Sequence, residues 1–116
     1  MKKIFSTAPD GNDNAQFVGV EYIKFSIFQI EDVCDWMRKN DEIAQPLLAN
    51  IDLLLTITRK YSVDANLLIE KDKVKEWKKV FNDWFERVGN KIPAKFRDGI
   101  KANGDELFKE LEQYGH

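Results

Sequence analysis

The sequence predicts a single α+β domain that is mostly helical, with an N-terminal strand pair or hairpin followed by four or five packed helices. Residues 9–14 are rich in Pro, Gly, Asp and Asn and are expected to form a turn between two stretches that favour strands. Residues 71–88 carry large rings at helical spacing. The 116 residues are 43% hydrophobic and 33% charged, so residues 1–116 are expected to build one core. An all-α bundle with an irregular N-terminus is the alternative.

The two strands are predicted from β-branched and aromatic residues. Residues 2–6 suit a short strand, and residues 16–25, QFVGVEYIKF, suit a second one. Glu21 and Lys24 would point to opposite sides of this second strand. We therefore expect a bulge or an edge position there.

The first two helices are predicted from a capping pattern and a broad apolar face. Ser26 is followed three residues later by Gln29, a capping box that predicts a helix from there to about residue 39. A second helix is expected over residues 42–60, with Pro46 near its start. Residues 62–70 fit either a short helix or an extended connection.

The helix at 71–88 is the clearest prediction. Its Trp, Phe and Val side chains occupy one sector, flanked by a lysine sector and an acidic sector. Burying this sector would contribute on the order of 10 kcal/mol, so Trp77 and Trp84 are expected inside the core. Gly89 is placed to end the helix in a left-handed conformation.

A further helical segment is expected after Pro93. Phe96 and Ile100 would face inward, and the Asn103–Gly104 pair would break the helix. Asp105 would then cap a last short helix.

Few side chains in the sequence suit catalysis or metal binding. Cys34 is the only cysteine and His116 the only histidine, so neither a zinc shell nor a Cys–His pair is available, and no disulfide forms within the chain. Glu31 and Asp35 stand four residues apart, but such acid pairs are common on solvated helices. Glycine-rich phosphate-binding motifs are missing. We therefore expect no catalytic residues, no metal and no cofactor.

One stretch partly matches a calcium loop. Asp10, Asn12, Asn14 and Glu21 occupy positions 1, 3, 5 and 12 of the EF-hand spacing. Ala15 stands where the loop needs glycine, and the flanks do not read as helices. A polar hairpin or loop is the favoured interpretation.

Charge and hydropathy narrow the possible partners. The net charge is −2, and residues 1–56 hold 5 basic against 9 acidic residues, which favours a partner with a basic surface. A lysine face, Lys71, Lys75, Lys78 and Lys79, is a candidate for nucleic acid, but acids adjoin it and the whole chain is negative. The longest apolar run is too short to span a membrane. The single cysteine favours a cytoplasmic location.

The helix expected at 27–39 offers the best candidate binding surface. Phe28 and Trp36 fall off its apolar stripe, and Asp32 and Asp35 lie between them. Exposed rings beside acids are typical of interface hot spots, in which rings provide buried area and charge provides orientation.

These observations predict a non-enzymatic protein-binding module. The class that fits best is an inhibitor such as a bacterial immunity protein that neutralises a toxin by blocking its surface. Two alternatives stay open: a phage-type inhibitor of a host defence system, and a small nucleic-acid-binding protein that uses the Lys71–Lys79 face.

Overall fold

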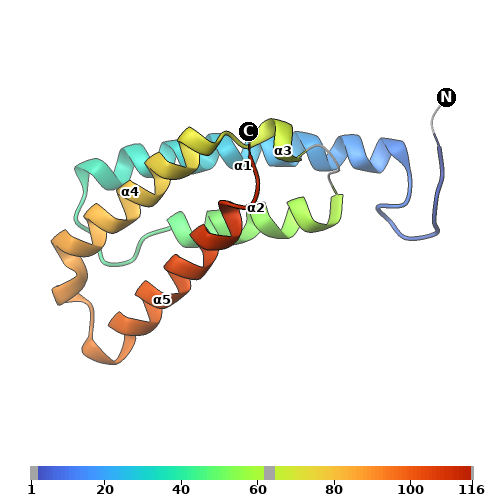
Figure 1. Cartoon of the computed structure of the whole chain (residues 1–116). Helices are drawn as coiled ribbons and strands as arrows, with labels where there is room; N and C mark the ends of the chain where they lie inside the picture. The colour runs from blue at the N-terminus through green and yellow to red at the C-terminus, as the bar shows by residue number, and fades with distance from the viewer. Residues whose placement is uncertain (1–2, 62–64, 116) are drawn as a thin grey trace.

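The computed structural model describes residues 3–61 and 65–115. Figure 1 shows α1 and α2 running antiparallel along the molecule, with α4 and α5 forming a second helical hairpin beside them. Contacts link α1 to α2, α2 to α5, α5 to α4 and α4 back to α1, so these four helices enclose one core. The elements are α1 (Asp13–Lys39), α2 (Leu47–Tyr61), α3 (Ala65–Leu68), α4 (Lys71–Val88), the 3₁₀ turn η1 (Gly89–Lys91) and α5 (Ala94–Leu111).

The expected α+β class is wrong, and the all-α alternative is the observed architecture. Residues 16–25 lie inside α1, and no strand occurs in residues 3–61 or 65–115. An isolated antiparallel bridge between Ile4 and Asn12 is the only β pairing in those ranges. Lys2, where the first strand was expected to begin, is outside the described residues.

The turn-forming residues expected to close a hairpin start α1 instead. The side chain of Asn12 accepts a hydrogen bond from the backbone N–H of Ala15 at 2.8 Å, which is an N-cap. Asp13 lies in the first turn, where a helix dipole favours an acid, and its carboxylate accepts from the backbone N–H of Lys3 at 3.0 Å. Ser26, expected to begin a helix, is buried in the middle of α1.

α1 and α2 pack through residues that recur every three or four positions. Gly19 lies so close to Tyr61 that a Cβ there would be 2.3 Å from the Tyr61 Cβ, which lets the two helices approach closely. The buried residues of α1 are Gly19, Ile23, Ser26, Ile30, Cys34 and Met37, and those of α2 are Leu47, Ile51, Leu54, Leu55 and Thr58.

The prediction for residues 71–88 is confirmed. α4 covers the whole segment, and Trp77, Phe81 and Trp84 are all 0% exposed. The ring of Phe81 lies 5.8 Å from the rings of both Trp84 and Phe108, so α4 and α5 share an aromatic centre. The indole N–H of Trp84 donates to the backbone carbonyl of Glu42 at 2.7 Å, which fixes the loop between α1 and α2.

The end of α4 differs from the expected left-handed cap. Gly89 has φ −55°, and the backbone continues into η1. Arg97 closes this turn: its Nε donates to the carbonyl of Gly89 at 2.7 Å, and its Nη2 donates to the carbonyls of Asn90 and Ile92 at 3.1 and 3.0 Å. The guanidinium thus provides donors to carbonyls at the helix end, in addition to the backbone N–H of Ile92, which donates to the carbonyl of Gly89 at 3.1 Å.

The expected break at Asn103–Gly104 is wrong as well. α5 runs through both residues, and Gly104 lies against the ring of Phe81, where a Cβ would be only 2.3 Å from Cζ. Asp105 is therefore inside α5 and caps nothing. Phe96 is 53% exposed rather than inward-facing, whereas Ile100 packs against the core as expected.

The two remaining segments were placed only approximately by the sequence. α2 begins at Leu47, directly after Pro46, and so starts later than expected. Within residues 62–70 the described part contains the short helix α3, and residues 62–64 are outside the described ranges.

The molecule is elongated. It measures 55 × 26 × 20 Å, and its Cα radius of gyration is 16.1 Å, against about 13 Å for a compact domain of this length. The 27 residues of α1 account for much of this length and give the protein one long exposed helix surface.

Candidate functional site

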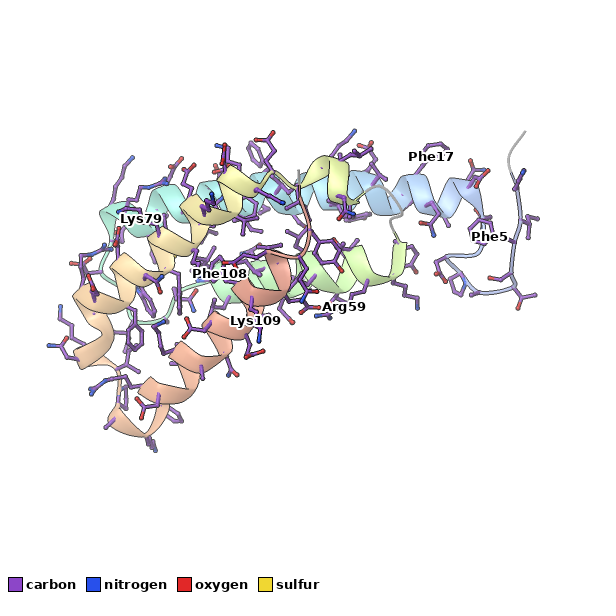
Figure 2. All side chains as sticks on the ribbon, viewed as in Figure 1. Phe5, Phe17, Arg59, Lys79, Phe108 and Lys109 are labelled. Carbon is purple, nitrogen blue, oxygen red and sulfur yellow. The ribbon has the colours of Figure 1, made fainter. Side chains whose placement is uncertain are left out.

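The solvent-exposed side of α1 carries a group of rings, which we call the outer face of α1. Figure 2 labels Phe17 on the side of α1 away from α2, whereas Phe108 points between the helices. The outer face consists of Phe17, Val18, Tyr22, Phe25, Phe28, Asp32 and Trp36.

Large side chains on this face are exposed to an unusual degree. Phe28 is 60% exposed, Phe25 58% and Tyr22 59%. Trp36 is less exposed, at 38%. Contiguous exposed rings are uncommon on the surface of a monomer and mark sites of interaction.

The structure places the four residues predicted from the sequence on this face. Phe28 and Trp36 are separated by two helical turns, about 12 Å along the axis, and Asp32 lies between them. Asp35 is exposed at the edge of the face, so the four residues share one surface.

Charge compensation on this surface is incomplete. Asp35 pairs with Arg38 at 2.7 Å, and Arg38 also pairs with Glu76 of α4 at 2.7 Å. Asp32, in contrast, is exposed and has no ion pair among the residues that the structure describes. A carboxylate without an ion pair therefore lies between Phe28 and Trp36, toward the C-terminal end of the outer face.

The neighbouring acid Glu31 is engaged in the contact between α1 and α4. It pairs with Lys73 at 3.1 Å, and this hydrogen bond raises the pKa of Lys73 above its ordinary value. Glu31 thus holds two helices together and does not form a pair of free acids with Asp35.

One row of positions along this side of α1 has the spacing of a helix-packing seam. Its members stand four, three, four, three and four residues apart, as at the core positions of a coiled coil; the row includes the half-buried Gln29, which is not part of the outer face, while Phe17 and Phe28 lie beside it. Two polar residues lie within the seam, and such residues fix the register of a partner helix. The seam positions are Val18, Tyr22, Phe25, Gln29, Asp32 and Trp36.

An open apolar hollow adjoins this face. It has a volume of about 320 Å³ and is lined by Val18, Gly19 and Tyr22 of α1 together with Ile57 and Tyr61 of α2. The close approach of the two helices at Gly19 forms its floor. A side chain from a partner has space to enter here.

Sequence reasoning missed the N-terminal half of the outer face. Phe17, Val18, Tyr22 and Phe25 were assigned to a strand, because β-branched and aromatic residues favour strands. A signal for the helix was nevertheless present in the sequence. Asn12 can cap a helix, and the small or apolar residues after it recur at helical spacing: Gly19, Ile23, Ser26 and Ile30.

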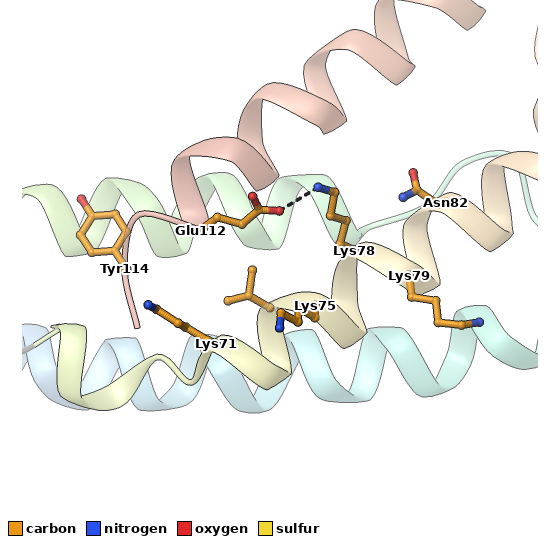
Figure 3. Close-up of a pocket in the computed structure, with 8 residues that line it drawn as sticks. Lys71, Lys75, Lys78, Lys79, Asn82, Glu112 and Tyr114 are labelled. Carbon is orange, nitrogen blue, oxygen red and sulfur yellow. Dashed lines mark hydrogen bonds and ion pairs between the residues drawn. The ribbon is translucent and has the colours of Figure 1, made fainter. Parts of the chain in front are cut away.

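The lysine face of α4 borders a second feature, an open cavity of about 570 Å³. All four lysines of that face line it, and Glu112 and Tyr114 line its other side. Figure 3 shows Lys71 and Lys75 near the cavity and Lys79 directed away from it.

The other candidates do not form a site in the described residues. Asn12 caps α1, while Asn14 and Glu21 lie within it, so the calcium-loop spacing does not wrap around one cation. No group of three or more His, Cys, Asp or Glu suited to a metal occurs in residues 3–61 and 65–115. Cys34 is buried, and His116 lies outside the described ranges.

Comparison of the chain with known protein families, curated proteins and solved structures gives no match. Among the described residues, no helix combines the length and apolar character needed to cross a membrane. Function is therefore inferred from the surfaces of the molecule itself.

Proposed function

We propose that this chain is a non-enzymatic protein-binding module that docks through the outer face of α1. The observation that carries the proposal is the row of exposed rings on one helix: Tyr22, Phe25 and Phe28 are each close to 60% exposed. The apolar area of such a face stays in contact with water, which is unfavourable, unless a partner covers it.

The partner we propose presents an amphipathic helix with a Lys or Arg opposite Asp32. The alternating four–three spacing supports a helix as the occupant. The carboxylate of Asp32, which has no ion pair, supports a basic residue in the partner. Docking would remove water from this carboxylate, and a Lys or Arg opposite it would compensate for the lost solvation. An apolar side chain of the partner would enter the hollow beside Tyr22 and Tyr61.

Within this class, an inhibitor in the cytoplasm is the function we favour. A toxin-neutralising immunity protein blocks its target by covering a surface, which needs a rigid face and no chemistry. A phage-type inhibitor of a host defence system would work in the same way. Both fit a small helical domain whose outer face combines rings with acids.

Binding to nucleic acid is the weaker candidate. Lys78 pairs with Glu112 at 2.8 Å and Lys79 with Asp83 at 2.6 Å, which removes half of the lysine face from phosphate contact. Affinity for nucleic acid would fall steeply with salt and depend on Lys71 and Lys75.

The test is quantitative capture of binding proteins from the native host with wild-type and altered chains. We expect a partner that the wild type retains and that the triple variant Asp32→Ala, Asp35→Ala, Trp36→Ala loses. A second variant, Phe25→Ser with Phe28→Ser, should lose the same partner, because these rings are more exposed than Trp36 and matter less to the fold.

The matched control is Phe96→Ala with Asp98→Ala on α5. It removes a ring that is 53% exposed and a nearby exposed acid, the same two kinds of side chain that the test variants remove, but on a different helix. Circular dichroism must show unchanged helicity and melting for every variant. Retention of the partner by both α1 variants, or its loss from the α5 control alone, would refute the assignment.

A further inference from the structure

The cavity beside the lysine face has the size of a site for a small molecule. Its volume of about 570 Å³ is within the range of pockets that hold small ligands. Tyr114 and Glu112 form one wall, because the chain after α5 turns back toward the start of α4. A Cβ on Gly115 would lie 2.8 Å from the carbonyl oxygen of Ile69, so this segment packs against the residues that lead into α4.

The cavity has an excess of positive charge. Lys78 is held by Glu112 at 2.8 Å, and Lys79 is turned away toward Asp83 at 2.6 Å. Lys71 and Lys75 stand one helical turn apart, and neither has an ion pair among the residues that the structure describes. Two lysines without ion pairs therefore line one open cavity.

The rest of the cavity is suited to an apolar or aromatic group. Val74 lies on α4 between the two free lysines, and Figure 3 shows Tyr114 at the same end as Lys71. Tyr114 packs against the core, which holds its ring in place. The aliphatic stems of the lysines extend this apolar surface.

We propose that this cavity binds a small organic anion, with a phosphate or carboxylate group between Lys71 and Lys75 and an apolar or aromatic body against Val74 and Tyr114. Lysine ammonium groups bind both kinds of anion through charge-assisted hydrogen bonds. Glu112 on one side of the cavity and the pairing of Lys78 and Lys79 with acids leave positive charge only at Lys71 and Lys75, which favours a small anion over a nucleic-acid strand that needs a longer basic groove.

The probe for the test is 1-naphthyl phosphate, followed by NMR of the backbone amides. We expect its titration to shift amides of residues 71–82 and 112–115 and to leave those of the outer face of α1 unchanged. Inorganic phosphate should bind more weakly, and uncharged 1-naphthol should not bind at this site. 1-Naphthoate in a parallel titration shows whether phosphate or carboxylate is preferred.

Three variants are expected to weaken, strengthen and leave unchanged the affinity for 1-naphthyl phosphate. Lys71→Gln with Lys75→Gln should weaken binding by at least about tenfold, the effect of losing one charge-assisted hydrogen bond. Glu112→Gln should strengthen binding several-fold, because it frees Lys78 and removes a competing carboxylate. The control, Lys91→Gln with Lys109→Gln, removes two exposed lysines elsewhere and should change nothing.

Several outcomes would overturn the proposal. These are no binding of any probe, shifts that map to another surface, and affinity that survives in the Lys71/Lys75 variant. Much tighter binding of a single-stranded DNA oligomer at the same residues would assign the cavity to nucleic acid instead. The lysine variants break no ion pair in the described residues, so loss of binding is separable from loss of fold.

Discussion

Cys34 illustrates how position alone sets the chemistry of a residue in this protein. The side chain is 0% exposed in the interior of α1. Burial raises the pKa of the Cys34 thiol from 9.0 to about 12, the neighbouring Arg38 partly opposes this, and Glu31 and Glu76 add to it. The thiol is therefore protonated at neutral pH and is not a nucleophile.

This shift predicts a loss of stability at alkaline pH. Between pH 9 and 12 the unfolded chain releases the thiol proton while the folded chain keeps it, so rising pH favours the unfolded state. At pH 10.5 the contribution lost is about 2 kcal/mol. Urea unfolding of the wild type and Cys34→Ala at pH 7 and 10.5 measures it. The wild type should lose more stability than the variant, in which all other titrations are the same, and equal losses would contradict the prediction.

At the scale of one element, α5 contains two glycines in opposite environments. A Cβ on Gly104 would lie 2.3 Å from Cζ of Phe81, whereas a Cβ on Gly99 would meet nothing within 4 Å. The ring of Phe81 is 0% exposed and is packed between Trp84 and Phe108, so it has no space into which to move. Two identical substitutions in one helix therefore have different consequences.

We predict that Gly104→Ala destabilises the fold by about 1–3 kcal/mol, the range for overpacking a core. Gly99→Ala should instead stabilise it by about 0.5–1 kcal/mol, because alanine favours the helical backbone. Denaturant unfolding of the two variants measures both values. Equal changes in the free energy of unfolding at the two positions would show that Gly104 does not pack closely against Phe81.

At the scale of the whole molecule, the elongated shape explains why α1 has a long exposed surface. A chain of this length that folded compactly would have a radius of gyration of about 13 Å, and the observed Cα value is 16.1 Å. The extra length comes from α1, of which α4 covers only the C-terminal part. An elongated domain of this kind presents a long, straight surface for docking.

Small-angle scattering and light scattering check this description. We expect a monomer of 13.6 kDa with a radius of gyration near 16.1 Å, slightly increased by hydration. A dimer whose outer faces cover each other would double the mass, and it would also contradict a hetero-partner for this surface. Phe25→Ser with Phe28→Ser distinguishes the cases, since only a dimer formed through this face would dissociate.

The amphipathic character of α4 was predictable without coordinates. Its apolar residues form one sector at helical spacing, and no strand places Trp77, Phe81 and Trp84 on one side. The outward position of Phe28 and Trp36 followed from the same geometry applied to residues 27–39. These predictions succeeded because the helical period alone separates the two sides of a segment.

The N-terminal half of α1 was not predictable in this way, because its residues suit a strand as well as a helix. Close packing of Gly19 on Tyr61 and burial of Ile23 and Ser26 select the helix. These contacts join residues far apart in the chain, and local propensity is too weak to oppose them. The lysine cavity likewise exists only because residues 112–115 return to α4. Periodicity thus defines faces within a segment, whereas long-range contacts determine which segments become helices and which faces remain open to a partner.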